Sequence, residues 1–328
     1  MDFFKDMKEK ASKDPKIVVL PELDKDEDGI LRKAMEIVKD EGTAIPIGLT
    51  LGSIENSGKL EEFAEAYEAK GNMTIGAKVR FVRKPLAFSA LMVKLGYAHG
   101  MVTGKYTDSA TVMAYVNHII GEEEGKIRSA TFFRETPKNY NIFDLVAISD
   151  MVANPNPTAE ELYRIIVTSA ETFEALTDKK PKIALLSYVT GFPKEAQFVK
   201  DPELKKINDT IELYKERKHP WLLYQTQADA ALIPSIAQKK GAPFKEPADL
   251  LIGSNLTMSN NVYKLFERLI YGGDSMIVTQ GLQYPAMDLS RGDSVSNIVN
   301  TINACSVQAQ KIEQKKGYRS IDTYFLDF

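Results

Sequence analysis

GLQYPAMDLSRGDS, residues 281–294, is the stretch around which the chain is organised. A β-rich run leads into it and a helical pattern follows it, so the stretch is a Gly/Pro-punctuated loop between a strand and a helix. Ser290, Arg291 and Asp293 place a hydroxyl, a guanidinium and a carboxylate within four residues. Arg291 offers a planar fork of donors, and the helix start adds unpaired backbone N–H groups, so the loop can hold an anion. The alternative is a polar turn in which Ser294 caps the helix and Arg291 lies in solvent, because Ser-Arg-Gly-Asp alone is a weak motif.

The bulk properties describe a soluble protein with more than one core. A chain of 328 residues is long enough for two domains, and an apolar share of 44% with a charged share of 27% is typical of globular proteins. The net charge of −3 gives no basic surface for nucleic acid. No run approaches the roughly 18–20 apolar residues that span a bilayer, and the N-terminus reads as an amphipathic helix without a signal core. We therefore expect a cytoplasmic protein without a membrane partner.

Candidate ligands for a metal or a redox cofactor are sparse. Cys305 is the only cysteine, so no internal disulfide can form, and its helical surroundings favour a small buried thiol over a nucleophile. His99, His118 and His219 are scattered without ligand spacing, which argues against a metal site. No dinucleotide fingerprint or phosphate loop is present, and we interpret residues 52–58 as a flexible turn.

The first third of the chain alternates short apolar runs with helical patterns. Strands are predicted at residues 16–20, 44–48 and 100–104, and helices at residues 30–38, 60–69, 87–95 and 109–120. This alternation predicts right-handed crossover units and a mostly parallel sheet covered by helices on both faces, which is an α/β fold.

The alternation of strands and helices ends at the charged run 122–125, and we place a domain boundary near residue 126. Two strands are predicted at 127–133 and 143–148, joined by a polar connection. Thr158 and Glu161 then form a capping box that begins a helix. The remaining predictions are strands at 182–187, 221–224 and 250–252, helices at 202–218, 228–238 and 260–271, of which the second is interrupted at Pro234, and a long final helix at 295–315. In the helix at 260–271 we expect Val262, Leu265, Phe266, Leu269 and Ile270 to face inward.

Several segments together resemble the phosphate acetyltransferase family. The sequence GLQYPAMDLSRGDSVSNIV at 281–299 is similar to the family pattern GLxKPVxDLSRGCSxxDIV. The segment at 91–104 resembles MMVKLGxADGLVSG, and NPNPTAEEL at 154–162 is nearly identical to a family segment. Further matches at 184–188, 229–231 and 261–265 occur in the same order, so the resemblance covers about residues 16–310.

The resemblance implies two α/β/α domains with mostly parallel, doubly wound sheets and a cleft between them. The first domain would comprise residues 1–126 plus 277–328, and the second, with a homodimer interface, residues 127–276. It also implies a reaction in which the thiolate of coenzyme A attacks an acyl phosphate directly in a ternary complex. Coenzyme A would then be a substrate, acyl phosphate, acyl-CoA and phosphate the other small-molecule ligands, and no metal or nucleotide redox cofactor would be needed.

Some functional positions of the family differ in this sequence. The catalytic aspartate of the family falls on Asn297, and two of its arginines fall near Met113 and Glu68. Lys70, Arg80, Arg83, Lys84 and Lys105 lie on nearby segments and could replace the lost positive charge, although we favour a solvated surface role for each. Asp293 is a gain, because Ser290-Arg291-Gly292-Asp293-Ser294 with Asn300 resembles the related phosphate butyryltransferases, which also lack that aspartate.

These patterns lead to two hypotheses. The first is a phosphate acyltransferase for acetyl or another short acyl group, in which Ser290 bonds the transferring group, Arg291 holds the phosphate and Asp293 is a base or an orienting residue. Thr103, Gly104, Thr111 and Asn261 are candidates for substrate or coenzyme A binding. The second hypothesis is a catalytically impaired homologue that binds acyl-CoA or acyl phosphate as a regulatory or scaffold protein.

Overall fold

The computed structural model describes residues 2–69, 71–137, 144–191, 200–270 and 272–316. The chain divides into two compact units, one of residues 4–124 and 277–328, the other of residues 1–3 and 125–276. The division expected from the sequence has its boundaries at 126/127 and 276/277. We call the two units the terminal unit and the middle unit and describe each separately.

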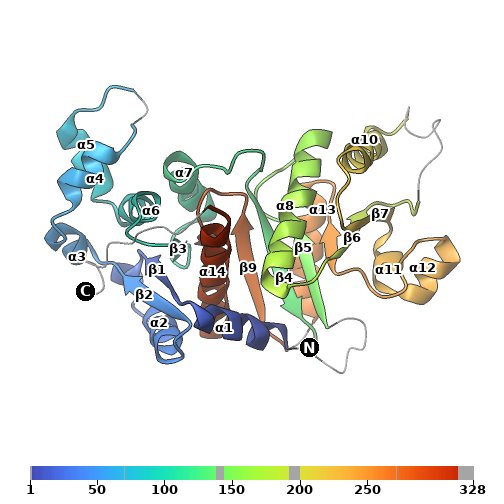
Figure 1. Cartoon of the computed structure of the whole chain (residues 1–328), viewed down its shortest axis with the longest axis horizontal. Coiled ribbons are helices and arrows are strands. Elements are labelled where there is room, and N and C mark those ends of the chain that lie inside the picture. The colour runs from blue at the N-terminus through green and yellow to red at the C-terminus, as the bar shows by residue number, and fades with distance from the viewer. Residues whose placement is uncertain (1, 70, 138–143, 192–199, 271, 317–328) are drawn as a thin grey trace. The chain divides into compact units, whose positions relative to one another are not determined.

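The terminal unit is built on a four-stranded parallel sheet (Figure 1). Its strands are β1 (Lys16–Leu20), β2 (Ala44–Gly48), β3 (Gly100–Thr103) and β10 (Ala286–Asp288), in the order β10-β3-β1-β2. β10 comes from the far end of the chain and pairs with β3, so that Asp288 lies opposite Thr103. The pairing brings the loop after β10 to the edge where β1 and β3 also end, since all four strands are parallel.

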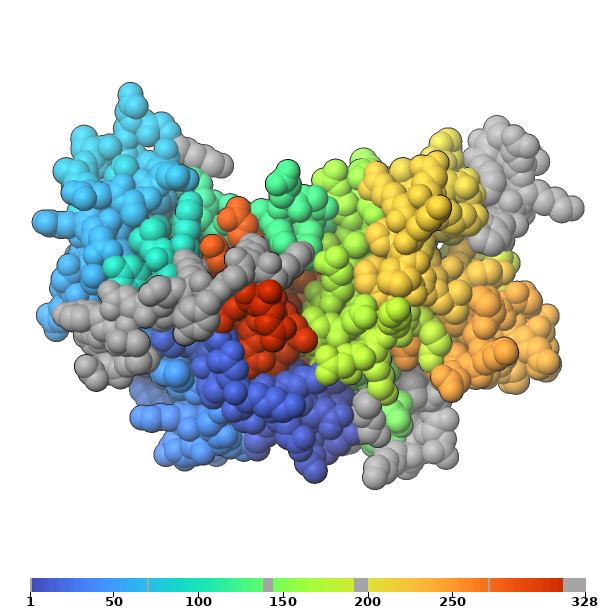
Figure 2. All heavy atoms as spheres, viewed as in Figure 1, coloured from blue at the N-terminus to red at the C-terminus, as the bar shows by residue number. Residues whose placement is uncertain are grey.

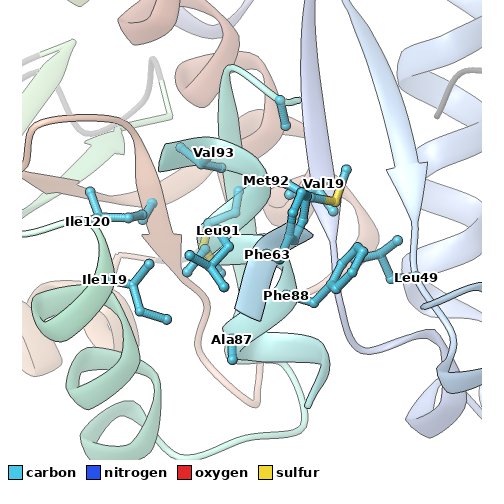
Figure 3. Close-up of a cluster of buried hydrophobic side chains, with 14 of the residues drawn as sticks. Val19, Leu49, Phe63, Ala87, Phe88, Leu91, Met92, Val93, Ile119 and Ile120 are labelled. Carbon is cyan, nitrogen blue, oxygen red and sulfur yellow. The ribbon is translucent and has the colours of Figure 1, made fainter. Parts of the chain in front are cut away.

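Helices cover both faces of this sheet. They are α1 (Phe3–Lys13), α2 (Ile30–Asp40), α3 (Leu51–Asn56), α4 (Leu60–Ala66), α5 (Ile75–Val82), α6 (Pro85–Leu95), α7 (Ser109–Ile119) and α14 (Val295–Lys316), with a 3₁₀ turn η1 (Leu23–Lys25). Alternate residues of β1, such as Ile17 and Val19, enter a core that also contains α6 and α7. Figure 3 shows Val19 near Phe63 and Phe88 in this core, and these two rings lie 4.7 Å apart between centroids. On the opposite face α14 packs on β1, β3 and β10 and against α2.

Helix α14 also fastens the N-terminal segment. The amide of Gln310 donates to the carbonyl oxygens of Lys10 (3.2 Å), Ala11 (3.2 Å) and Asp14 (2.8 Å). Figure 2 shows the red surface of α14 directly against the dark blue N-terminal segment. Cys305 lies fully buried on this helix, and its burial raises the pKa of the thiol, as expected for a structural cysteine.

The middle unit holds a six-stranded mixed sheet in the order β7-β6-β8-β5-β4-β9. Its strands are β4 (Ser129–Glu135), β5 (Leu145–Ser149), β6 (Lys182–Leu186), β7 (Leu222–Thr226), β8 (Leu250–Ile252) and β9 (Ser275–Gln280), which leads back to the terminal unit. β4 and β5 are antiparallel, as expected for two strands joined by a short polar connection, while β5, β8, β6 and β7 are parallel to one another. The two sheets thus have the α/β class and the mostly parallel pairing that the sequence predicts.

The described residues of the middle unit include the helices α8 (Ala159–Thr177), α10 (Pro202–Glu216), α11 (Ala228–Leu232), α12 (Pro234–Lys240) and α13 (Leu256–Leu269). The capping box that begins α8 is confirmed. The Thr158 hydroxyl accepts from the Glu161 N–H at 3.3 Å, and the Glu161 carboxylate accepts from the Thr158 N–H at 2.8 Å.

The predicted interruption of the helix 228–238 at Pro234 is confirmed, since α11 ends at Leu232 and α12 begins at Pro234, which lacks the N–H that a continuous helix needs. Two predictions of local structure are wrong. Residues 52–58 are predicted as a flexible turn, but Leu51–Asn56 form α3, which begins at a capping box of Thr50 and Ser53. In α13 the predicted inward residues Leu265 and Leu269 are 57% and 70% exposed, because spacing shows that a helix has an apolar face but not what covers it. None of the helices described is long and apolar enough to cross a membrane.

Candidate active site

The loop from Leu289 to Ser294 leaves the sheet at the carboxyl end of β10. The Leu289 N–H donates to the Thr103 carbonyl at 2.7 Å, which continues the pairing of β10 with β3 by one residue. The Asp293 N–H then donates to the Ser290 carbonyl at 3.0 Å, and the Asp293 carboxylate accepts from the Ser290 N–H at 2.7 Å. The backbone around Ser290 and Arg291 is therefore held in one closed turn.

The start of α14 forms the other side of this turn. The Ser294 hydroxyl accepts from the Asn297 N–H at 3.2 Å and caps the helix, which is one of the two roles expected of this loop. The Asn297 amide lies 3.5 Å from the second carboxylate oxygen of Asp293. Both oxygens of Asp293 thus face donors within its own loop, which fits an orienting role better than that of a base.

Lys105 fastens the loop from the side of β3. Its side chain is only 7% exposed, and its ammonium group donates to the carbonyl oxygens of Arg291 at 2.8 Å and Asp293 at 2.9 Å. The interpretation of Lys105 as a solvated surface cation is therefore wrong. Of the other cations in that group, Arg80, Arg83 and Lys84 are exposed, as expected, and Lys70 lies outside the described residues.

The backbone of Lys105 is held in turn by Glu22, which follows β1. One carboxylate oxygen of this buried side chain accepts from the N–H groups of Gly104 (2.8 Å) and Lys105 (3.0 Å), and the other accepts from Tyr106 (3.2 Å). Three consecutive backbone N–H groups of this kind form an anion-binding nest, and here the chain fills the nest with its own carboxylate. Sequence reasoning missed Glu22, although its place directly after a parallel strand is a usable signal.

Helix α7 begins at the same edge of the sheet. Asp108 caps it, since its carboxylate accepts from the N–H of Thr111 at 2.9 Å and from the Thr111 hydroxyl at 2.8 Å. The pKa of Asp108 lies below its ordinary value, first through these two hydrogen bonds and also through the positive charge of Arg291. The loop bearing Arg291 and the start of α7 therefore lie near each other.

The guanidinium of Arg291 is the exposed cation of this group. It makes no hydrogen bond or ion pair with other residues that the structure describes, although its backbone carbonyl is held by Lys105. The Ser290 side chain beside it is half-buried, and its oxygen accepts from the Gly292 N–H at 3.4 Å. A fixed backbone with a half-buried hydroxyl and an accessible guanidinium suits the binding of an anionic group.

The remaining candidates fall into two groups. Thr103, Gly104 and Thr111 belong to the terminal unit and lie at the edge just described. Asn261 belongs to α13 of the middle unit, where its exposed amide donates to the Thr257 carbonyl at 2.9 Å. Within the terminal unit, Met113 packs against the core, and Glu68 pairs with Lys94 at 3.2 Å on the surface. No group of three or more His, Cys, Asp or Glu side chains suited to a metal ion occurs in the part of the chain with described coordinates.

Solved structures show which class of protein this fold defines. The chain is similar to a phosphotransacetylase from Streptococcus pyogenes, with a TM-score of 0.79 and 26% identity over 94% of this chain and 98% of that one. A phosphotransacetylase from Staphylococcus aureus has a TM-score of 0.76 at 25% identity over the same shares. The fold is that of the phosphotransacetylases.

Sequence comparisons narrow this class to a family. The model of the phosphate acetyl/butaryl transferase family matches residues 2–305, and the chain belongs to that family. It is 31% identical to the phosphate acetyltransferase of Acetivibrio thermocellus over 95% of this chain and 100% of the relative. It is 32% identical to that of Clostridium acetobutylicum over 87% of this chain and 85% of the relative.

Proposed function

We propose that the chain is a phosphate acyltransferase that moves an acetyl or another short acyl group between an acyl phosphate and coenzyme A. Its relatives bear the name phosphate acetyltransferase, and the family model covers almost the whole chain. The observation that carries the proposal is the loop 289–294. Asp293 and Lys105 hold its backbone, while the Ser290 hydroxyl is half-buried and the Arg291 guanidinium is exposed.

In this proposal the reaction is a direct attack of the coenzyme A thiolate on the acyl carbon in a ternary complex. The guanidinium of Arg291 binds the phosphoryl oxygens and offsets the charge that develops on the leaving phosphate. The Ser290 hydroxyl donates to the transferring group. Asp293 orients both, because its carboxylate closes the turn that carries them.

The test is the formation of thioester from coenzyme A with acetyl phosphate and, separately, with butyryl phosphate, followed by thioester absorbance. We expect turnover with at least one acyl phosphate, and the ratio of the two rates reports the acyl length. Arg291→Ala should lower kcat/KM by about 30-fold to 10³-fold, since one well-placed donor contributes roughly 2–4 kcal/mol. Arg164→Ala, which removes an arginine of the middle unit whose side chain is 41% exposed and pairs with Glu160, is the control and should change little.

The same assay separates catalysis from the alternative of an impaired homologue with a regulatory or scaffold role. That alternative predicts saturable binding of coenzyme A without thioester from either acyl phosphate, and no change in turnover on Arg291→Ala. Calorimetric binding of coenzyme A, measured beside the turnover assay, distinguishes the two outcomes.

We further propose that the protein is a cytoplasmic homodimer and that α13 takes part in its interface. Leu265 and Leu269 lie one helical turn apart on the surface and are among its most exposed large apolar side chains. Leu265→Glu should shift the molar mass measured by light scattering towards that of a monomer. Ile75→Glu, at an exposed apolar residue of α5, should leave the mass unchanged.

A further inference from the structure

Two neighbouring strands of the terminal unit end in buried side chains, each with an oxygen that has no hydrogen-bond partner in the described structure. Asp288 ends β10 and Thr103 ends β3, and the two residues lie opposite each other in the register of the sheet. They are 7% and 1% exposed, yet Asp288 Oδ1 and Thr103 Oγ1 have no hydrogen-bond partner among the residues described. Buried polar atoms are nearly always bonded in folded proteins, so a pair of unbonded ones calls for a ligand or a function.

The chain makes room for the Asp288 carboxyl at Gly104. This glycine has a φ of 97°, in the left-handed region, and a Cβ placed on it would lie 2.2 Å from Asp288 Oδ1. The same Cβ would lie 2.9 Å from the Leu289 nitrogen. The backbone after β3 therefore approaches the carboxyl as closely as only glycine permits.

The charges around Asp288 favour its neutral form. Glu22 faces it from the loop after β1, Asp108 from the start of α7, and Asp293 from the loop after β10. The nearby cations interact with groups other than the Asp288 carboxyl. The ammonium of Lys105 donates to the carbonyls of Arg291 and Asp293, and the charge of Arg291 acts on Asp108. Burial first, and then these three acids, raise the pKa of Asp288 to about 6, while the Ser109 hydroxyl acts in the opposite direction.

Ser109 connects this buried acid with the surface. It is the first residue of α7, which packs against β10, and it is exposed; its hydroxyl lies near enough to the Asp288 carboxyl to hold the pKa of that group down. A hydroxyl can accept one proton while it gives up its own, so Ser109 can pass a proton between a bound ligand and Asp288. An acid that changes its charge near neutral pH is suited to such an exchange.

We propose that Asp288, reached through the Ser109 hydroxyl, accepts the thiol proton of coenzyme A in the acyl transfer. The inference rests on the proposed function and supplies the proton acceptor that Asn297 cannot be. The thiol S–H bond breaks, its proton passes to the Ser109 oxygen, and the Ser109 hydroxyl proton passes to the Asp288 carboxylate. The thiolate then forms a bond to the acyl carbon, and the bond from that carbon to the phosphate oxygen breaks with its electron pair on phosphate. The proton returns by the same route to a phosphate oxygen, which restores the carboxylate.

The experiment compares pH–rate profiles of thioester formation from acetyl or butyryl phosphate and coenzyme A. The wild-type rate should fall as the pH drops through about 6, where the Asp288 carboxylate becomes protonated. Asp288→Asn should lower kcat by about 10²–10⁴-fold, with little change in KM for coenzyme A, and abolish this acid limb. Its thermal unfolding should show that the variant is folded.

Two further variants should shift the acid limb, which is the fall in rate at low pH, in opposite directions. Asp108→Asn keeps a cap for α7 but removes one like charge, so the limb should move to lower pH. Ser109→Ala removes the hydroxyl that stabilises the carboxylate, so the limb should move to higher pH and kcat should fall. If Asp288 had a purely structural role, the acid limb would stay at the wild-type pH in both variants.

The outcomes separate this inference from the function on which it rests. Wild-type turnover with an Asp288→Asn variant that retains both the rate and the acid limb overturns the role of Asp288 alone. Acid limbs that stay in place in both Asp108→Asn and Ser109→Ala overturn it as well. Absence of thioester from the wild-type chain with either acyl phosphate overturns the proposed function and this inference together.

Discussion

Asp150 and Asp288 are two buried aspartates, one in each unit, and each lies at the carboxyl end of a strand. They differ in how many hydrogen bonds their carboxylate oxygens accept. Asp150 directly follows β5, and its Oδ1 accepts from the N–H groups of Ala130 (3.0 Å), Val152 (3.2 Å) and Ala153 (3.2 Å). Its Oδ2 accepts from Ala153 (3.2 Å) and from the N–H (2.8 Å) and side-chain amide (2.7 Å) of Asn154. Asp288 ends β10, and its Oδ1 accepts from nothing in the described part of the chain.

The difference shows that burial alone does not tell a structural carboxylate from a functional one. The backbone bends around Asp150 so that its donors converge on both oxygens, and the carboxylate holds the turn together. Around Asp288 the backbone leaves space at Gly104, no described residue donates to Oδ1, and the nearby charged groups that act on its pKa are acids. The first arrangement stabilises the fold, whereas the second costs stability and has to be explained by what the site does.

The largest expected effect is at Asp150. Asp150→Asn should lower the free energy of unfolding by about 3–5 kcal/mol, because the new amide nitrogen cannot accept from the N–H groups around it. Chemical denaturation of both proteins measures the change. Asp209→Asn, at an exposed i,i+4 pair with Lys205, is the control and should change stability by less than about 0.5 kcal/mol. Equal effects at the two positions would contradict the structural role of Asp150.

At Asp288 the same substitution should have the opposite sign. The pKa of Asp288 is about 6 in the folded chain, above the ordinary value of 3.8, so the folded protein binds more protons than the unfolded chain between these values. The contribution of Asp288 to stability therefore falls as the pH rises through this window, by at most about 3 kcal/mol. Asp288→Asn cannot ionise and should be more stable than wild type at pH 7 by about 1–3 kcal/mol. Denaturation at several pH values would show it, and a less stable variant at pH 7 would refute it.

A smaller effect is expected where one donor is taken from Asp150. The Asn154 amide donates to the Asp150 carboxylate at 2.7 Å and to the Arg128 carbonyl at 2.9 Å. Asn154→Ala should therefore cost about 1–2 kcal/mol of unfolding free energy, measured by denaturation. Asn72→Ala, at an exposed position, is the comparison and should stay within about 0.5 kcal/mol of wild type.

The smallest effect is expected at Thr103. Its hydroxyl is buried without a partner in the described structure, so Thr103→Val removes no hydrogen bond and should change stability by less than about 1 kcal/mol, with a gain as the expected sign. Thr226→Val is a matched substitution at a buried strand residue whose hydroxyl lies 3.3 Å from that of Thr190, and it should lower stability. A larger loss at Thr103 than at Thr226 would mean that the Thr103 hydroxyl stabilises the fold.

Much of the fold could be predicted from local patterns. Thr158 and Glu161 predicted the start of α8, because a capping box involves residues only three apart. The cap at Ser294, part of the alternative interpretation of the loop as a polar turn, also involves residues three apart, since its hydroxyl accepts from the Asn297 N–H. The alternation of apolar runs with helical patterns predicted the parallel strands. The polar side chains of Ser290 and Arg291 could also be predicted to lie together in the loop, since the two residues are adjacent in the chain.

The residues that hold this loop in place could not be predicted from the sequence. Lys105 reaches the carbonyl of Arg291 across 186 residues of sequence, and Glu22 reaches the N–H of Gly104 across 82. A lone lysine or glutamate in a sequence is ordinarily a surface residue, and only the meeting of β1, β3 and β10 buries these two. Each of them follows the carboxyl end of a parallel strand, and that position was the one available hint.

The sequence by itself determined the α/β class, the caps of the main helices and the family to which the chain belongs, because these depend on short spacings and on ordered motifs. The tertiary structure alone decided that Lys105 and Glu22 hold the loop and that α13 exposes Leu265 and Leu269. It also decided that Asp288 is buried with one oxygen that receives no hydrogen bond from the residues described. The physical reason is that burial and charge are set by neighbours in space. The strand pairing of β3 with β10 supplies those neighbours from distant parts of the chain.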